Sequence, residues 1–391
     1  MNILDWLLVV LTLAYGISGY WQGFVTGATA TLGLLFGGAL GIVLVPLALG
    51  QLAPSITVSL GALMCVLVSA SIGQALGSVA GARARDRITW KPARSLDAIG
   101  GAALSMVAVL VVAWALGYAV SGTKLPSISD QVRQSNVLSR IDAVMPDGAE
   151  TVLGAFNKVV DSNLFPRYLE PFASEQIVDV PKPDKRVLKR TGVLAAEGSV
   201  VKVTGDAVDC GRSIEGSGFV YSDDRVMTNA HVVAGVDEPT VTVGDERLGA
   251  TVVLYDPDLD VAVLAVDGLD AESLRFDDTA ESEDSAVVLG FPENGPYDVQ
   301  PARIRSQISL RGPDIYDEGT VVREVYSVRA LVRSGNSGGP LVSPRGRVLG
   351  VVFAASLSDT STGYVLTADQ VAESARQGVQ ATDTVSTGDC A

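Results

Sequence analysis

The stretch Ser334-Gly335-Asn336-Ser337-Gly338-Gly339-Pro340 sets one serine among glycines, which permit sharp backbone turns. Upstream, Thr228-Asn229-Ala230-His231-Val232 contains the only histidine of the chain, and Asp258-Leu259-Asp260-Val261-Ala262-Val263 lies between the two. A serine hydroxyl becomes an effective nucleophile when a neighbouring base takes its proton, and that base needs a carboxylate to orient it. Imidazole has a proton affinity suited to this work near neutral pH. The pattern predicts Ser337 as nucleophile, His231 as base and Asp260 as orienting carboxylate, in preference to a histidine that only fills the core.

The chain from Ser199 onward is built of short β-branched runs separated by Gly, Asp or Pro turns. Many runs of this length indicate an all-β sandwich or a pair of barrels, with one terminal helix expected over Ala368–Arg376. Examples are Val200–Val203, Gly218–Tyr221, Thr240–Val243, Thr251–Leu254, Val261–Val266, Ala286–Leu289, Val321–Val328, Val348–Phe353 and Tyr364–Leu366.

The N-terminal part is apolar instead, with four stretches at Ile3–Tyr20, Phe24–Leu49, Ile56–Ala80 and Ile99–Val120. Each is near or above the roughly 20 residues that a membrane-spanning helix needs. A secretory signal is disfavoured for the first stretch, because it carries Asp5 without a leading Lys or Arg and further spans follow at once. We therefore predict a four-helix membrane anchor over residues 1–120.

The predicted loop Gly81–Ser95 concentrates basic residues, whereas the other connections have almost none. The positive-inside rule places this loop in the cytoplasm, so everything after Gly122 is expected on the extracytoplasmic, periplasmic side. A nucleic-acid patch is disfavoured because hydrophobic spans flank the loop on both sides. The basic residues are Arg83, Arg85, Arg87, Lys91 and Arg94.

Charge also argues against nucleic acid as a partner. Residues 191–391 carry 32 acidic and 14 basic side chains, a net of −18, against +3 for the first 190, which agrees with the total of −15. An acidic domain offers no basic face for phosphates.

Glycines recur every four residues at Gly33, Gly37 and Gly41 and again at Gly73, Gly77 and Gly81. Such spacing allows helix backbones to approach closely, although glycine is also simply common in membrane helices, and both interpretations stay open. Gln74 is polar within the third span, and helix packing is favoured over a functional polar site.

The three cysteines fit an exported domain. Cys65 lies in a membrane span and is expected to pack as a small apolar residue. Cys210 and Cys390 both fall on the predicted outer side, where an oxidising environment favours a disulfide between them. One histidine and two distant cysteines lack metal-ligand spacing, so neither a metal nor another cofactor is expected.

With these segments placed, residues 195–391 resemble the chymotrypsin-like serine proteases, particularly the bacterial HtrA-type branch. The resemblance rests on Gly216-Ser217-Gly218-Phe219-Val220 and on the three stretches around His231, Asp260 and Ser337. Gly19-Tyr20-Trp21-Gln22-Gly23-Phe24 is similar to the colicin V production family of membrane proteins. The combination, with the two outer cysteines, resembles the MarP-type actinobacterial membrane-anchored acid-resistance serine proteases over essentially the whole chain.

The resemblance implies a double β-barrel with the reacting groups between the barrels. Ser337, His231 and Asp260 take the roles given above, and the backbone N–H groups of Gly335 and Ser337 form the oxyanion hole. Asn336 departs from the digestive-type members, which carry there an aspartate that pairs with a newly cut amino terminus. Leu331 stands at the usual specificity position, and the following strand, through Phe353, Ala354 and Ala355, is expected to pair with substrate backbone.

We therefore expect a membrane anchor over residues 1–120, a connector over 121–195 with a short amphipathic helix near 152–160, and a trypsin-like protease domain over 196–391. The expected activity is cleavage of envelope or periplasmic proteins through an acyl-enzyme, in acid or envelope stress. The expected partners are protein substrates and the lipid bilayer. An ester hydrolase of the α/β type is disfavoured by the chain order of the triad. A membrane scaffold, signalling or transport protein whose outer domain only binds peptides is the alternative.

Overall fold

The computed structural model of the 391-residue chain describes residues 1–49, 56–121, 131–145, 168, 175–356 and 358–391. The chain divides into two compact units, Met1–Tyr118 with Gln134–Met145 and Ala119–Arg133 with Pro146–Ala391. The helix predicted near residues 152–160 lies outside the described residues.

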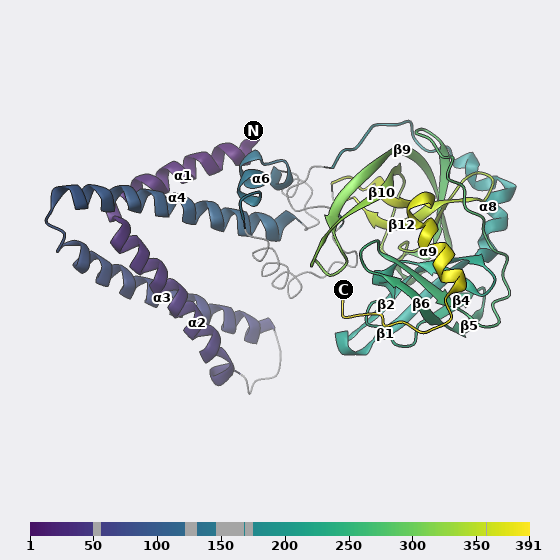
Figure 1. Ribbon diagram of the computed structural model, residues 1–391, viewed down its shortest axis with the longest axis horizontal. Helices are drawn as coiled ribbons and strands as arrows, with labels where there is room; N and C mark the ends of the chain where they lie inside the picture. The colour runs from purple at the N-terminus through teal and green to yellow at the C-terminus, as the bar shows by residue number, and fades with distance from the viewer. Residues whose placement is uncertain (50–55, 122–130, 146–167, 169–174, 357) are drawn as a thin grey trace. The chain divides into compact units, whose positions relative to one another are not determined.

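The first unit is helical, and its long helices are those expected from the apolar stretches (Figure 1). They are α1 (Ile3–Gln22), α2 (Phe24–Leu49), α3 (Ile56–Arg85) and α4 (Lys91–Ser121), followed by the short α6 (Asn136–Asp142). Among the described residues, the segments Ile3–Gln22, Phe24–Gly41 and Lys91–Tyr118 are long and apolar enough to cross a membrane. The protein is thus a membrane protein.

The helices extend beyond the apolar stretches at the basic connection. α3 continues to Arg85, and α4 starts at Lys91 instead of Ile99. An apolar run marks the part of a helix that lies in hydrocarbon, whereas charged side chains at the helix ends can reach the interface. Most of the basic residues assigned to a loop therefore lie on helix ends.

The glycine repeats lie where α2 crosses α3. A Cβ atom at Gly33 would lie 2.1 Å from the carbonyl oxygen of Gly73, and one at Gly77 would lie 2.1 Å from that of Thr29. No side chain fits between backbones at this separation. The close-packing interpretation of the repeats is therefore confirmed for this pair of helices.

The junction between α1 and α2 explains the motif that ends in Gly23-Phe24. Gly23 adopts φ +80°. The buried Asp97 accepts a hydrogen bond from the Val25 N–H at 2.9 Å and pairs with Arg85 at 2.7 Å. One carboxylate therefore caps the start of α2 and joins it to the ends of α3 and α4.

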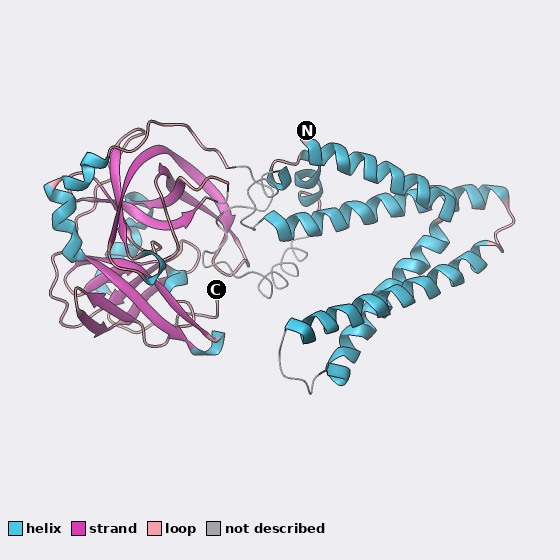
Figure 2. Ribbon diagram, turned by 180° about the vertical axis from the view of Figure 1, so that it is seen from behind, coloured by secondary structure: helices cyan, strands magenta, loops and turns pink. Residues whose placement is uncertain are grey.

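The second unit contains two β structures (Figure 2). A seven-stranded sheet has the order β5-β4-β1-β2-β3-β7-β6, and a closed barrel has the order β10-β13-β12-β11-β8-β9. All pairs within them are antiparallel. The prediction of an all-β domain is confirmed, and the runs form a sheet and a barrel instead of a sandwich.

The strands of the sheet are β1 (Val200–Ala207), β2 (Arg212–Ser222), β3 (Arg225–Thr228), β4 (Thr240–Val243), β5 (Glu246–Gly249), β6 (Thr251–Asp256) and β7 (Val261–Ala265). Those of the barrel are β8 (Ser285–Gly290), β9 (Asp298–Pro313), β10 (Thr320–Arg329), β11 (Pro340–Val342), β12 (Val348–Ala355) and β13 (Thr362–Thr367). Helical segments are η1 (Lys185–Lys189), α8 (Thr191–Ala195), η2 (Ala196–Ser199), η3 (Val208–Cys210), η4 (Ala230–Val232), η5 (Pro292–Asn294) and the terminal α9 (Ala368–Gln380).

A shared core holds the sheet against the barrel. Phe219 and Met227 of the sheet belong to the same buried cluster as Leu289, Val351 and Leu366 of the barrel. Burial of these apolar side chains stabilises the contact between the two structures. Loops that leave strands at this contact can therefore bring residues from both structures to one site.

Helix α9 bridges the two structures from outside. The Gln370 side chain accepts a hydrogen bond from the Glu324 N–H of β10 at 2.8 Å. Near the other end of the helix, Arg225 of β3 donates to the Gly378 carbonyl at 2.9 Å. The helix runs on to Gln380, four residues beyond the expected Arg376.

Candidate active site

His231 and Asp260 meet at the ends of neighbouring strands of the sheet. His231 lies in η4, just after β3, and Asp260 immediately precedes β7. The ring Nδ1 of His231 lies 2.8 Å from Oδ2 of Asp260, and the His231 backbone N–H also donates to Oδ1 at 3.0 Å. Both residues are buried. An Nδ1–H that donates to the carboxylate leaves Nε2 available to accept a proton.

Asn229, which sequence reasoning did not single out, fixes the position of Asp260. Its side-chain amide donates to the Asp260 carbonyl at 2.7 Å, and Asn229 itself is fully buried. Asp260 has φ +63°, a left-handed conformation that is uncommon outside glycine. The hydrogen bond holds this strained turn, so that the carboxylate faces His231.

Ser337 is held against β2, which pairs with β3, the strand that leads to the histidine. Its carbonyl accepts a hydrogen bond from the Ser217 N–H of β2 at 2.8 Å. The next residue, Gly338, has φ +81°, and a Cβ atom there would lie 2.1 Å from the Ser217 carbonyl and 2.3 Å from Oγ1 of Thr228. The glycine after the serine is thus required by a close backbone approach. This approach brings Ser337 beside the segment that runs from Thr228 to His231.

The Ser337 side chain is 2% exposed, and its hydroxyl has no hydrogen-bond partner among the described residues. The hydroxyl is therefore not bonded to His231 in this state. Hydrogen bonds of this kind are often long in a free enzyme and shorten when substrate binds. A rotation about χ1 of Ser337 changes the position of the hydroxyl without any change in the backbone.

The peptide before Gly335 is oriented by a contact that sequence reasoning missed. The Glu293 N–H donates to the Ser334 carbonyl at 2.7 Å. Every described peptide is trans, so the Gly335 N–H points away from that carbonyl. Glu293 itself has φ +58°, and Gly335 has φ +86°. Within the described chain, the N–H groups of Gly335 and Ser337 have no hydrogen-bond partner.

The peptide after Gly335 is fixed by Ser217. The Ser217 hydroxyl donates to the Gly335 carbonyl at 2.6 Å and accepts from the Phe291 N–H at 2.8 Å. Ser217 is fully buried. Both peptides around Gly335 therefore have a fixed orientation, which is the arrangement that binding an oxyanion needs.

Asn336, which stands where digestive-type members carry an aspartate, has a structural role. Its side-chain oxygen accepts from the Arg333 N–H at 2.9 Å, and its own N–H donates to the Arg333 carbonyl at 3.0 Å. The Arg333 guanidinium also pairs with Asp298 and with Glu293. Asn336 thus closes the turn that leads into Ser337.

The predicted substrate-binding residues lie on two segments. Leu331 is 45% exposed, whereas Phe353 is 2% exposed and Ala354 is fully buried. The side chains of Phe353 and Ala354 are therefore not available to a substrate, whereas Ala355 is partly exposed. β12 pairs with β13 along one edge through Ala354 and Ala355. Val332 was not predicted, yet it is buried and packs against Gly363, where a Cβ atom would lie 2.4 Å from its side chain.

The cysteines pair as expected, since a disulfide joins Cys210 to Cys390. Cys65 is free and exposed in the helical unit. No group of three or more His, Cys, Asp or Glu side chains that could hold a metal ion occurs in the described ranges.

Comparison with known proteins matches two families to the two parts of the chain. The colicin V production protein family matches residues 4–146, and the trypsin-like peptidase domain family matches residues 216–351. The chain is 33% identical over 138 residues to a probable periplasmic serine endoprotease DegP-like of Pseudomonas putida, covering 35% of this chain and 28% of that protein.

The similarity to a mycobacterial protein extends over the whole length. Serine protease Rv3671c of Mycobacterium tuberculosis is 40% identical over 392 residues, covering 99% of this chain and 98% of that one. The crystal structure of the active form of the Rv3671c protease matches with 49% identity and a TM-score of 0.54. The match covers 57% of this chain and 98% of that one. This match confirms the chymotrypsin-like fold. The chain therefore belongs to the Rv3671c family of serine proteases, in which a colicin V production-type membrane domain precedes a trypsin-like peptidase domain.

Proposed function

We propose that this serine protease is a membrane-anchored endopeptidase in which Ser337, His231 and Asp260 carry out acyl transfer. The observation that supports this most is the 2.8 Å contact between His231 and Asp260, beside a serine whose neighbouring Gly335 N–H is free and oriented. The His231–Asp260 pair and the Gly335 N–H have the geometry that their assigned roles require, and the Ser337 hydroxyl is expected to turn toward His231 when substrate binds.

In the proposed reaction, Oγ of Ser337 attacks the carbonyl carbon of the scissile peptide while Nε2 of His231 takes its proton. Asp260 stabilises the resulting imidazolium, and the N–H groups of Gly335 and Ser337 bind the oxyanion. His231 then gives the proton to the leaving amine, which leaves an acyl-enzyme on Ser337. Water, activated by His231, hydrolyses the ester and restores the hydroxyl.

We propose the anchor, connector and protease division at residues 1–120, 121–195 and 196–391, with the protease on the extracytoplasmic side. The exposed basic residues at the ends of α3 and α4 support this orientation, as does the disulfide of the protease unit. A membrane-impermeant maleimide tests it on intact cells. Gln176→Cys should be labelled and Arg87→Cys should not, and the reverse pattern would invert the topology.

The proposed substrates are proteins of the cell envelope or periplasm, cleaved during acid or envelope stress. Exposed Leu331 and buried Val332 favour an apolar side chain at the cleavage point. Comparing new protein termini in cells that carry wild type or Ser337→Ala, at neutral and acid pH, identifies them. Identical termini in both strains under both conditions would contradict this assignment.

A fluorophosphonate probe, which reacts with activated serines, tests the chemistry in the full-length protein in detergent. Wild type should be labelled and should cleave peptides, while Ser337→Ala should do neither with an unchanged unfolding temperature. A folded wild type that binds peptides but is never labelled would favour the peptide-binding scaffold instead.

A further inference from the structure

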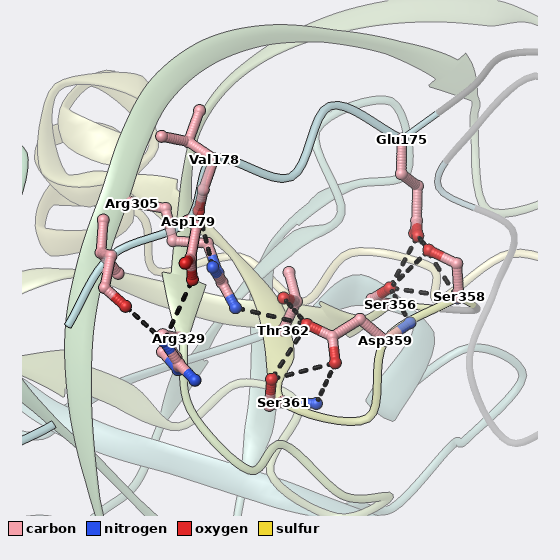
Figure 3. Close-up of polar contacts among 11 residues, drawn as sticks. Glu175, Val178, Asp179, Arg305, Arg329, Ser356, Ser358, Asp359, Ser361 and Thr362 are labelled. Atoms are coloured by element: carbon pink, nitrogen blue, oxygen red, sulfur yellow. Dashed lines mark hydrogen bonds and ion pairs between the residues drawn. The ribbon is translucent and has the colours of Figure 1, made fainter. Parts of the chain in front are cut away.

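A segment of the connector docks on the barrel at β9 and at the C-terminal ends of β10 and β12. We call Glu175–Val180 the strap. It lies upstream of η1, and its contacts reach β9, β10 and the turn between β12 and β13 (Figure 3). None of the strap's hydrogen bonds with the described residues involves Ser337 or His231.

The first contact holds the end of β12. The Glu175 carboxylate accepts hydrogen bonds from the Ser356 hydroxyl at 2.7 Å, from the Ser358 N–H at 3.3 Å and from the Ser358 hydroxyl. Ser356 follows Ala355, the last residue of β12. A carboxylate with several donors makes stronger hydrogen bonds than a neutral acceptor. Glu175 therefore ties down the end of the strand predicted to pair with substrate.

The second contact passes through Arg305 of β9, which is 3% exposed. Its guanidinium donates to the Val178 carbonyl at 2.6 Å and pairs with Asp359 at 3.3 Å. A buried cation is costly unless such partners surround it. Asp359 also accepts from the Thr362 hydroxyl at 2.6 Å and from the Ser361 N–H at 3.1 Å. Arg305 thus connects the strap to Asp359 and, through it, to Ser361 and Thr362.

The third contact reaches the segment that leads to the nucleophile. Arg329, the last residue of β10, donates to the Val180 carbonyl and pairs with Asp179 at 3.2 Å. The next residue, Ala330, donates its N–H to the Ser361 carbonyl at 2.9 Å. The strap therefore holds residues 329–330 and the turn 356–362 together, and these flank Leu331 on one side and Ala355 on the other.

We propose that the strap is a positioning segment that sets the spacing between the two walls of the substrate pocket and so determines how tightly substrate binds. The proposal rests on the proposed function, because it takes Leu331 and β12 as the substrate-binding elements. The connector from the membrane domain is then part of the protease's specificity machinery. It acts on substrate affinity without touching the reacting groups.

The test uses full-length protein in detergent and an internally quenched peptide selected for cleavage by wild type. Glu175→Ala should raise KM about tenfold, as expected for the loss of charge-assisted hydrogen bonds, with kcat changed less than about twofold. The rate of labelling by a small fluorophosphonate should stay within about twofold, because the probe makes few contacts with the pocket walls. Glu175→Gln keeps one acceptor oxygen and should recover part of the affinity.

Gln176→Ala is the matched control, since Gln176 is exposed and its side chain makes no hydrogen bond or ion pair with the described residues. Hydrogen exchange at residues 356–362 should be faster in Glu175→Ala than in this control, even if the variant is less stable. An unchanged KM with an unchanged rate of hydrogen exchange would overturn the proposal. So would a fall in kcat and in the labelling rate as large as the rise in KM, because that would indicate that Glu175 supports the fold in general. A wild type that the probe does not label would instead overturn the proposed function, and the role of the strap with it.

Discussion

Ser217→Ala removes the hydroxyl that ties the loop before the nucleophile to the sheet. In the native protein this hydroxyl bridges the Gly335 carbonyl at 2.6 Å and the Phe291 N–H at 2.8 Å. Alanine fits the site sterically but leaves both backbone groups without that partner. The variant therefore separates the orientation of the Gly335 N–H from the chemistry of the triad.

The magnitude follows from the two groups left unpaired. An unsatisfied buried polar group costs about 1–3 kcal/mol. Gly335 is buried and Phe291 only partly so, and the free energy of unfolding should therefore fall by about 2–4 kcal/mol for the two groups together. For a domain of this size that corresponds to a decrease in Tm of roughly 4–16 °C. Deleting an oxyanion donor costs about 10²–10³ in kcat. Here the donor stays but loses its fixed orientation, so we expect kcat to fall by about 10- to 100-fold.

The assay combines kcat at saturating peptide with thermal unfolding, both below the Tm of the variant. Ser213→Ala is the control, because Ser213 lies on the same strand but is exposed, and among the described residues its hydroxyl donates a hydrogen bond to Asp206 alone. The Ser213→Ala control should keep the kcat and the Tm of the wild type. A Ser217→Ala protein with a lowered Tm and wild-type kcat would refute the role of this hydroxyl in orienting the oxyanion site.

Three further variants probe other parts of the molecule. Gly73→Val places a side chain where backbones of α2 and α3 nearly touch, so the full-length protein should lose stability in detergent, seen as earlier thermal aggregation; an unchanged transition would contradict the crossing. Cys210→Ser with Cys390→Ser opens a closed loop of 180 residues and should cost up to about 5 kcal/mol of unfolding free energy, measured by denaturant titration. Burial opposes ionisation of Asp359, but hydrogen bonds from residues 361–362 outweigh it and hold its pKa below the ordinary 3.8. Its stabilising contribution is therefore present above about pH 4 and lost as pH falls through the lowered pKa. Asp359→Asn should be less stable than wild type at about pH 5 and 7, and the gap should shrink as the pH is lowered below about 4; a gap that closes already at about pH 5 would contradict this.

The reacting side chains could be predicted from the sequence because their chemistry requires particular residue types. The chain contains a single histidine to act as the base, and the glycines around Ser337 predict a tight turn. The residues that position them gave no such signal. Glu293 acts through its backbone N–H and a left-handed φ, and Ser217 is one of many serines until the fold places it against Gly335.

The strands were predicted where β-branched residues dominate, and the named runs do not include β3, β5, β11 or the long β9 (Asp298–Pro313). The sequence of β9 contains Arg303, Arg305 and Arg311 and two prolines, and such residues weaken the pattern of a buried strand. The structure nevertheless buries Arg305, because the strap and Asp359 supply its partners. Those partners are distant in the sequence, so neither the strand nor the strap's role could be inferred from local patterns.

The most direct test of the account is the value of kcat/KM for Ser337→Ala, His231→Ala and their double variant, with Asp260→Asn measured beside them. Members of such a triad act as a unit, so each alanine variant should lose nearly all activity and the double variant should be little worse than either. Asp260→Asn should lose about 10⁴-fold, because the imidazole tautomer is no longer fixed. Folded variants that keep more than about a tenth of the activity, or a double variant whose losses simply multiply, would contradict the assignment of Ser337, His231 and Asp260 as one catalytic unit.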